Sequence, residues 1–449
     1  MRTRFARAAF SAALALAAAA ALPACLGSDA YRQMGRELAA APPPPREDGP
    51  DPFAGETFLR RDAVLREVLR RNPSIHAARS AWRAALARYP QARSLDDPRV
   101  AYGVAPLSFG SNDVNDAHQA ELSQRLPFPG KLALRGEVML AEAEAAEHEL
   151  AAVRLRLATM AWLLYDELYL LDRALEVNAH HVALLEEFRE LATRRYEAGE
   201  ASQQDPLQAE VEHARLLQRE VSLRADRRVV AEQLNVLLHR PSGTPLPPPP
   251  VVFDLPSPEL DAAEREALLA RALERPELRA AGARVRSREA DVALARREFL
   301  PDVTVVGAYN GVMQERDLQP FVGLALEVPL QLRRRFARLD QAQADLARAE
   351  RERAGVEDEL RFEVEAALER LAEARDVLAL HRDRLLPAAR DQLEAARIGF
   401  VSGRNSFLAL IEAENNLRDF ELGLERARTD VSRRVAELQR AAGVLPSGE

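Results

Sequence analysis

The stretch Ala117-His-Gln-Ala-Glu-Leu-Ser-Gln-Arg-Leu126 alternates between apolar and polar side chains. Its two sides carry, respectively, Ala120, Leu122 and Leu126, and Gln119, Glu121, Ser123 and Arg125. Successive side chains of a β-strand point to opposite faces. A strand that crosses a lipid bilayer needs about 9–11 residues with an apolar outer face and a polar inner face. The stretch therefore predicts a transmembrane strand.

Three further stretches share this pattern, so we expect strands at 98–106, 117–126, 302–310 and 320–328. Glu121 and Glu327 fall on the polar faces and are candidates for the lumen of a barrel, with a simple solvated wall as the alternative. Four strands cannot close a barrel, because the smallest barrels have about eight. The chain is therefore expected to oligomerise, and this reasoning leaves two copies and three copies both open.

Very long helical patterns follow each strand pair. Between Gly136 and Gly199 lie 62 residues without Gly or Pro, which corresponds to a helix of roughly 90 Å. Two heptad seams run along it, namely Leu157, Leu164, Leu171 and Leu185, and Leu163, Leu170, Val177, Leu184 and Leu191. A helix with two offset seams has neighbours on both sides, as in the wall of a helical barrel.

The second half of the chain repeats the first. Asn72-Pro73 matches Arg275-Pro276 at an offset of 203, and Gly199 matches Gly403 at an offset of 204. A near-constant offset indicates a duplicated unit. We expect a first repeat at 57–240 with a helical hairpin at 131–239, a Pro-rich linker at 241–258, and a second repeat at 259–445 with a hairpin at 333–441. The second long helix contains Pro387 and is expected to bend or break there.

The N-terminus has the features of a bacterial export signal. Residues 1–24 combine arginines with an Ala/Leu run and are expected to be a signal peptide. Cys25 follows Leu-Pro-Ala, which resembles a lipobox, so we expect its lipidation and sorting to the outer membrane. Residues 25–56 include four consecutive prolines and are expected to form a lipid-anchored flexible tether.

Composition excludes several classes of function. Without the three arginines of the leader, 59 basic residues face 70 acidic ones, for a net charge of about −11, which argues against a nucleic-acid partner. Apart from the leader, no stretch approaches the ~18 apolar residues of a transmembrane helix. Any membrane crossing is therefore expected to be made by strands.

Motifs for catalysis or metal binding do not stand out. Of the eight histidines only His180 and His181 are close in sequence, and adjacent residues on a helix diverge too far to share an ion easily. We therefore expect surface histidines. No phosphate-binding loop, catalytic triad order or paired carboxylates are evident. We expect no enzyme activity, no cofactor and no metal site.

The segment Leu386–Glu414 resembles the second-half signature of the TolC family of outer-membrane efflux proteins, and Tyr196–Asp205 resembles the equivalent site of the first half. Leu126–Lys131, Leu-Pro-Phe-Pro-Gly-Lys, resembles the branch that serves heavy-metal efflux pumps. The resemblance implies a mainly α protein with a small transmembrane β part. It implies a homotrimer with a 12-stranded β-barrel in outer-membrane lipid and an α-helical barrel across the periplasm.

The hairpin turns are the candidate functional sites. An aromatic residue, a glycine and a serine recur at spacings of three, as Tyr196, Gly199 and Ser202, and as Phe400, Gly403 and Ser406. Glycine can stop a helix in the left-handed conformation, and serine can cap the returning helix. We expect these six residues to receive an adaptor protein.

Two charged residues near the turns are candidates for the tunnel mouth, namely Asp205 and Arg404. In an oligomer such residues would form charged rings. Asp205 precedes Pro206, so the alternative is a helix N-cap.

The sequence favours a passive exit duct for small toxic solutes or metal ions. It would be joined through a periplasmic adaptor to an inner-membrane pump, for which the resemblance favours a proton-driven RND pump. One alternative is the duct of an ATP-driven type I protein secretion system. Another is a lipid-tethered periplasmic coiled-coil scaffold. A wide duct makes few specific contacts, so the cargo is not encoded in a recognisable motif.

Overall fold

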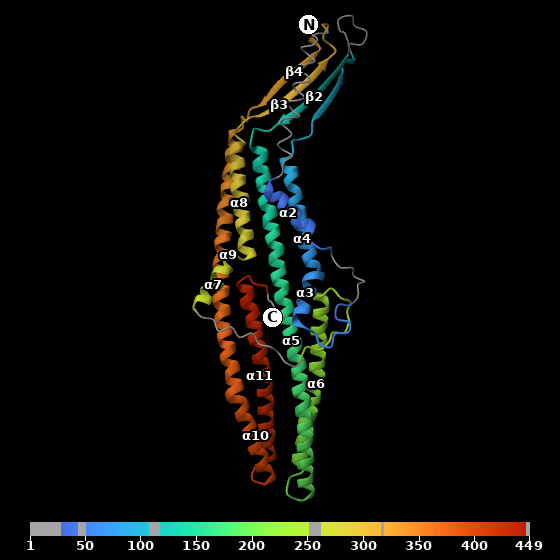
Figure 1. Cartoon of the computed structure of the whole chain (residues 1–449), viewed down its shortest axis with the longest axis vertical. Helices are drawn as coiled ribbons and strands as arrows, with labels where there is room; N and C mark the ends of the chain where they lie inside the picture. The colour runs from blue at the N-terminus through green and yellow to red at the C-terminus, as the bar shows by residue number, and fades with distance from the viewer. Residues whose placement is uncertain (1–27, 44–50, 107–116, 251–261, 316–317, 446–449) are drawn as a thin grey trace. The chain divides into compact units, whose positions relative to one another are not determined.

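The structure is a computed structural model that describes residues 28–43, 51–106, 117–250, 262–315 and 318–445. The chain divides into two compact units. The first comprises Met1–Pro42, Ala78–Leu150 and Glu277–Val356, and the second comprises Pro43–Ala77, Ala151–Pro276 and Glu357–Glu449. The described residues are mainly helical, with one small sheet (Figure 1). This confirms the predicted fold class.

The first unit contains a four-stranded antiparallel sheet in the order β1-β2-β3-β4 (Figure 1). Its strands are β1 (Arg99–Val104), β2 (His118–Leu126), β3 (Asp302–Asn310) and β4 (Pro320–Glu327). The predicted strands are confirmed to within two residues at each end. Most of the loop between β1 and β2 lies outside the described residues.

The register of the sheet separates one mainly apolar face, on which His118 and Gln124 are polar exceptions, from one mixed face. Leu122 lies opposite Val100 and Gly307, and Gly307 lies opposite Val322. Directly paired residues project to the same side of a sheet. The side that contains Leu122 therefore also carries Val100, Tyr102, Val305, Val322, Leu324 and Leu326, and most of these are exposed. The predicted division of side chains between two faces is confirmed.

The helices of the first unit are α2 (Asp29–Ala40), most of α4 (Pro73–Arg93), the start of α5 (Lys131–Glu197), nearly all of α8 (Pro276–Arg297) and the start of α9 (Leu332–Leu380). The backbone N–H of Ser28 donates to the Tyr89 hydroxyl at 3.0 Å, and the Tyr31 ring stacks on Tyr89 at 4.8 Å. Met34 and Leu38 are buried. The expectation of a flexible tether is therefore wrong for residues 29–40, which form a packed helix.

A buried ion pair lies where the sheet meets the helices. Lys131, the first residue of α5, donates from Nζ to Asp302 Oδ1 at 2.7 Å and to the Leu300 carbonyl at 2.8 Å. Asp302, the first residue of β3, also accepts from Arg125 at 2.9 Å and from the Phe128 backbone at 2.8 Å. This network fixes the ends of β2 and β3 to the start of α5.

The second unit contains the ends of both helical hairpins. It comprises α3 (Arg61–Arg71), the rest of α5, α6 (Gln204–Leu237), α7 (Ala262–Ala272), the rest of α9, the π-helix η4 (His381–Leu385), α10 (Leu386–Val401) and α11 (Phe407–Ala441). In this unit α6 returns beside α5, and α11 returns beside α10 (Figure 1). Pro387 occupies the start of α10, directly after η4. The chain stays helical from α9 through η4 to α10, so the expected break is replaced by a π-helical turn just before the proline. None of the helices in the described part of the chain combines the length and hydropathy needed to cross a membrane.

The two seams of α5 differ in burial. In the first seam Leu157, Leu171 and Leu185 are buried. Every member of the second seam is only half-buried, namely Leu163, Leu170, Val177, Leu184 and Leu191. The first seam of α5 is thus largely buried within the chain, whereas the second seam is only partly buried.

Candidate functional site at the turns of the helical hairpins

The two hairpin turns share one backbone design. Gly199 has φ +77° and Gly403 has φ +70°, both in the left-handed region. The Gly199 N–H donates to the Tyr196 carbonyl at 2.9 Å, and the Gly403 N–H donates to the Phe400 carbonyl at 3.1 Å. The predicted glycine stops are confirmed, and the duplication extends to the geometry of the turn.

The two serines act at slightly different places. Ser406 is the N-cap of α11, and its Oγ accepts from the Ala409 N–H at 3.3 Å. Ser202 Oγ accepts from the Gln204 N–H at 3.2 Å, but the N-cap of α6 is Gln203, which makes no side-chain cap. Asp205 lies inside the first turn of α6, so its interpretation as an N-cap is wrong.

The two aromatic residues differ in their surroundings. Tyr196 is 43% exposed, whereas Phe400 is 2% exposed and packs edge-on against Phe407 with ring centroids 5.3 Å apart. Phe400 belongs to a cluster, here called the turn core, that draws on both hairpins: Leu185, Phe188, Ala192, Ala209, Leu216, Ala396, Phe400, Phe407, Leu410, Ile411 and Ala413. The exposed aromatic position is therefore confined to the first turn.

Arg195 joins the two turns, and sequence reasoning missed it. Its guanidinium donates to the Phe400 carbonyl oxygen and lies 4.8 Å from the centroid of the Phe400 ring. Its Nε is 3.6 Å from a carboxylate oxygen of Glu200. Arg195, at the end of α5, thus bonds to the end of α10. This contact joins the two hairpins in addition to the turn core.

The two candidate charges of the tunnel mouth have separate local environments. Burial raises the pKa of Asp205, against the opposing effect of the nearby Arg195 charge. Arg404 is exposed, and its Nε donates to Ser402 Oγ at 2.9 Å. Each therefore interacts within or next to its own turn, and their role as rings stays a prediction.

The two strand carboxylates lie on the mixed face of the sheet. Glu121 is paired in register with Ala101 and Ala308 and is exposed. Glu327 is also exposed, and its Oε2 lies 3.0 Å from Arg125. Their place in a lumen stays a prediction.

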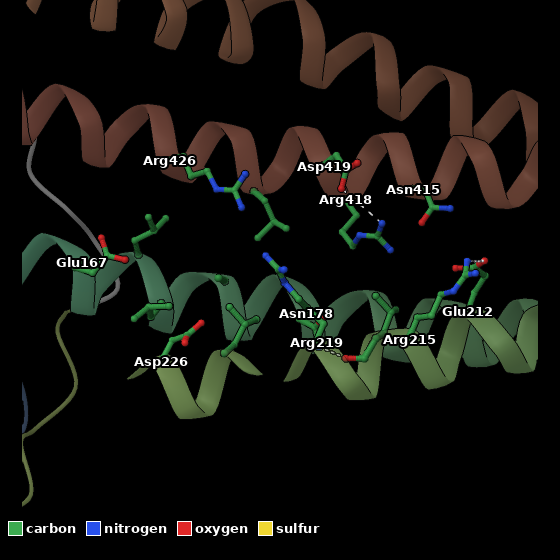
Figure 2. A pocket seen from close by; sticks show the side chains of 16 residues that line it. Glu167, Asn178, Glu212, Arg215, Arg219, Asp226, Asn415, Arg418, Asp419 and Arg426 are labelled. Carbon is green, nitrogen blue, oxygen red and sulfur yellow. Dashed lines mark hydrogen bonds and ion pairs between the residues drawn. The ribbon is translucent and has the colours of Figure 1, made fainter. Parts of the chain in front are cut away.

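A charged groove lies between α11 and the α5–α6 pair in the second unit. It has a volume of about 850 Å³ and is lined by residues of both signs. Figure 2 shows side chains from α11 projecting toward those from α5 and α6. The polar residues that line the groove are Glu167, Asn178, Glu212, Arg215, Arg219, Asp226, Asn415, Arg418, Asp419 and Arg426. Along this stretch a charged crevice separates the hairpins.

Comparison with solved structures shows the fold of outer-membrane channels. VceC of Vibrio cholerae superposes with a TM-score of 0.73 at 20% identity, over 86% of this chain and 96% of that one. CusC superposes with a TM-score of 0.74 at 18% identity, over 90% of this chain and 99% of that one. The outer-membrane channel CmeC of Campylobacter jejuni gives 0.70 at 14% identity, over 85% of both chains. No curated protein shows significant sequence similarity to the chain.

The sequence profile described as "Outer membrane efflux protein" matches residues 64–238 and 268–444. The two matched segments fall within the two repeats expected from the sequence, 57–240 and 259–445, and include both turns. Proteins of this kind are channels rather than enzymes. The chain therefore belongs to the outer membrane efflux protein family.

Proposed function

We propose that the chain is the outer-membrane exit duct of a tripartite efflux system, and that it works as a homotrimer. The duct is passive: an inner-membrane pump, of the proton-driven RND type, supplies the energy, and a periplasmic adaptor connects the two. The cargo consists of small toxic solutes or metal ions. The observation that carries the proposal is a short sheet with an exposed, mainly apolar face, whose two end strands each have one neighbour among the described residues.

The sheet supports an assembly of several copies. Among the described residues β1 pairs only with β2, and β4 pairs only with β3. An unpaired edge in a bilayer leaves backbone groups without hydrogen-bond partners. Three copies of four strands close into a ring of twelve. The half-buried second seam of α5 supports the same assembly, because a neighbouring copy can cover it.

A periplasmic coiled-coil scaffold accounts poorly for this sheet. Leu122, Leu324 and Leu326 are exposed on one face together with Val100 and Tyr102. An apolar patch of this kind is unfavourable in water. Lipid contact explains why the residues of this face are apolar. The first test of the proposed duct is whether the purified protein forms ion-conducting pores in planar bilayers.

We propose that the two turns receive the adaptor, and valine at both glycines tests this role. At Gly199 a Cβ would meet no atom within 4 Å, and at Gly403 it would meet only Arg195 at 3.4 Å. The effect of Gly199→Val/Gly403→Val is therefore mainly backbone strain, about 1–2 kcal/mol at each turn. That strain leaves the trimer folded but distorts the docking surface. We expect normal trimers in the outer membrane, with loss of adaptor crosslinking and of efflux.

Gly355→Val is the matched control. Gly355 lies within α9, has no positive φ and has open space at its Cβ position. It should retain crosslinking and resistance. If the double turn variant also retains both, the adaptor does not dock at these turns.

We propose that Cys25, which lies outside the described residues, is lipidated and anchors the protein in the outer membrane. Cys25→Ser is expected to leave unprocessed precursor or a mis-sorted product. Mass spectrometry of the mature N-terminus checks this directly. An unacylated N-terminus with a free amine in the wild-type protein contradicts lipid anchoring but leaves the proposed duct intact.

A further inference from the structure

His181 lies between the charged groove and the turn core. Along α5 it follows the groove-lining Asn178 and precedes Leu185 of the turn core. His181 is fully buried, whereas its neighbour His180 is exposed. The prediction of surface histidines is therefore wrong for His181, whose partners come from residues more than 230 positions away.

Both ring nitrogens of His181 face carboxylates of α11. Nδ1 lies 2.8 Å from Glu414 Oε1, and Nε2 lies 3.0 Å from Glu421 Oε2. The Glu414 side chain is 1% exposed and the Glu421 side chain 20%. Only the imidazolium form has an N–H on both nitrogens. The charged ring therefore makes two charge-assisted hydrogen bonds, and the neutral ring turns a lone pair toward one carboxylate.

Other charged and titratable groups surround this cluster. On α11, Arg418 lies 3.8 Å from Glu414 Oε2, and on α10, Arg390 lies 3.9 Å from Glu421 Oε1. On α5 the His180 ring is edge-on to His181 at 5.5 Å. From η4, His381 packs edge-on against Phe420 and bonds to the Val377 carbonyl.

Each glutamate therefore has an arginine nearby in addition to its hydrogen bond with His181. From α6, the Leu216 carbonyl accepts from Asn178 of α5 at 3.1 Å, and the charged residues Glu212 and Arg215 line the groove beside Asn178.

We propose that His181, Glu414 and Glu421 form a pH-dependent clamp that holds the first helical hairpin to the second. The role of the clamp in closing the duct rests on the proposed function. In that role its release weakens the contact between the two hairpins, so that the turn core and the Arg195 contact can open and the two turns can separate.

The direction of the pH effect follows from the two partners. Burial lowers the pKa of His181, but its hydrogen bonds to Glu414 and Glu421 outweigh burial and raise the pKa above its ordinary value of 6.5. The stabilisation of the hairpin contact by protonated His181 is thus complete below pH 6.5 and is lost as pH rises through the raised pKa. The hydrogen bond with His181 lowers the pKa of Glu421 below its ordinary 4.5. The stabilisation of the same contact by ionised Glu421 is present above pH 4.5 and is lost as pH falls through the lowered pKa.

The test measures the separation of the two hairpins on the purified full-length protein. Spin labels are placed through Glu197→Cys and Glu412→Cys, which are exposed positions on the first and second hairpins. Labelled chains are diluted with unlabelled ones so that distances within one chain dominate. A sample without the introduced cysteines reports any label at Cys25.

We expect one short distance at pH 6 and a reversible, growing population of longer distances toward pH 9. His180→Gln, the matched control, should keep this profile. His181→Gln should show the longer distances at pH 6 already and no further change with pH. The clamp is overturned if the wild-type distances do not change between pH 6 and pH 9, or if His181→Gln retains the wild-type pH dependence.

Glu421→Gln provides a second variant if His181→Gln does not fold, because Glu421 is partly exposed. Losing one carboxylate should move the midpoint of the transition to lower pH, and an unchanged midpoint contradicts the clamp. These measurements use neither adaptor nor bilayer. Absence of pores in planar bilayers would contradict the proposed duct but not the clamp. A negative result in the spin-label measurements would contradict the clamp but not the duct.

Discussion

Leu324→Arg is expected to abolish most trimer assembly in the outer membrane, whereas Ala325→Arg is expected to assemble and change conductance. Leu324 is 76% exposed and lies opposite Val305 on the apolar face of the sheet. Arginine on the lipid face of a barrel costs about 2–4 kcal/mol near the bilayer midplane. Three copies would thus lose roughly 6–12 kcal/mol per trimer. Ala325 lies opposite Thr304 on the other face, where an arginine would meet water in the proposed lumen.

The measurement is the fraction of trimer in outer-membrane extracts, followed by single-channel recording of whatever assembles. The two substitutions are adjacent and introduce the same side chain on opposite faces of the strand. Equal loss of trimer from both would show that the apolar face does not meet lipid.

The elements that could be predicted are those set by local periodicity. The strands alternate with a period of two, and their faces follow from the sequence once one strand is placed. The turns at Gly199 and Gly403 carry their own backbone signal, because glycine adopts positive φ without steric cost. Pro387 likewise indicates where its helix becomes irregular, because a proline inside a helix removes one backbone hydrogen bond, and a π-helical turn lies just before it.

The elements that could not be predicted depend on contacts between distant parts of the chain. Arg195 is one of 61 arginines, and only the fold brings it to the Phe400 carbonyl 205 residues away. His181 has no local motif, because its glutamates come from another helix. Helix α2 lies in a segment whose prolines suggested a tether, and tertiary packing against Tyr89 gives it a place in the fold.

Breaking the ion pair between Lys131 and Asp302 is expected to have the second large effect. Lys131 is the only lysine of the sequence, and the exposed fractions of the two side chains are 6% and 8%. Asp302→Leu leaves the ammonium buried with only the Leu300 carbonyl as a partner, and it also removes the acceptor of the Phe128 N–H. Removing one member of a buried pair costs about 3–5 kcal/mol. We expect a loss of this size in the free energy of unfolding, measured by denaturant titration in detergent.

Lys131→Met should cost less than Asp302→Leu, because Asp302 retains Arg125 at 2.9 Å and the Phe128 N–H at 2.8 Å. The double variant Lys131→Met/Asp302→Leu should recover part of the loss, since it removes both charges from the buried site. Lys131→Arg tests why this one position uses lysine: the larger guanidinium must fit a site filled by an ammonium, and overpacking costs about 1–3 kcal/mol. Strictly additive losses in the double variant would show that the two charges act independently, and the junction between sheet and helix would then be held by the surrounding backbone contacts instead.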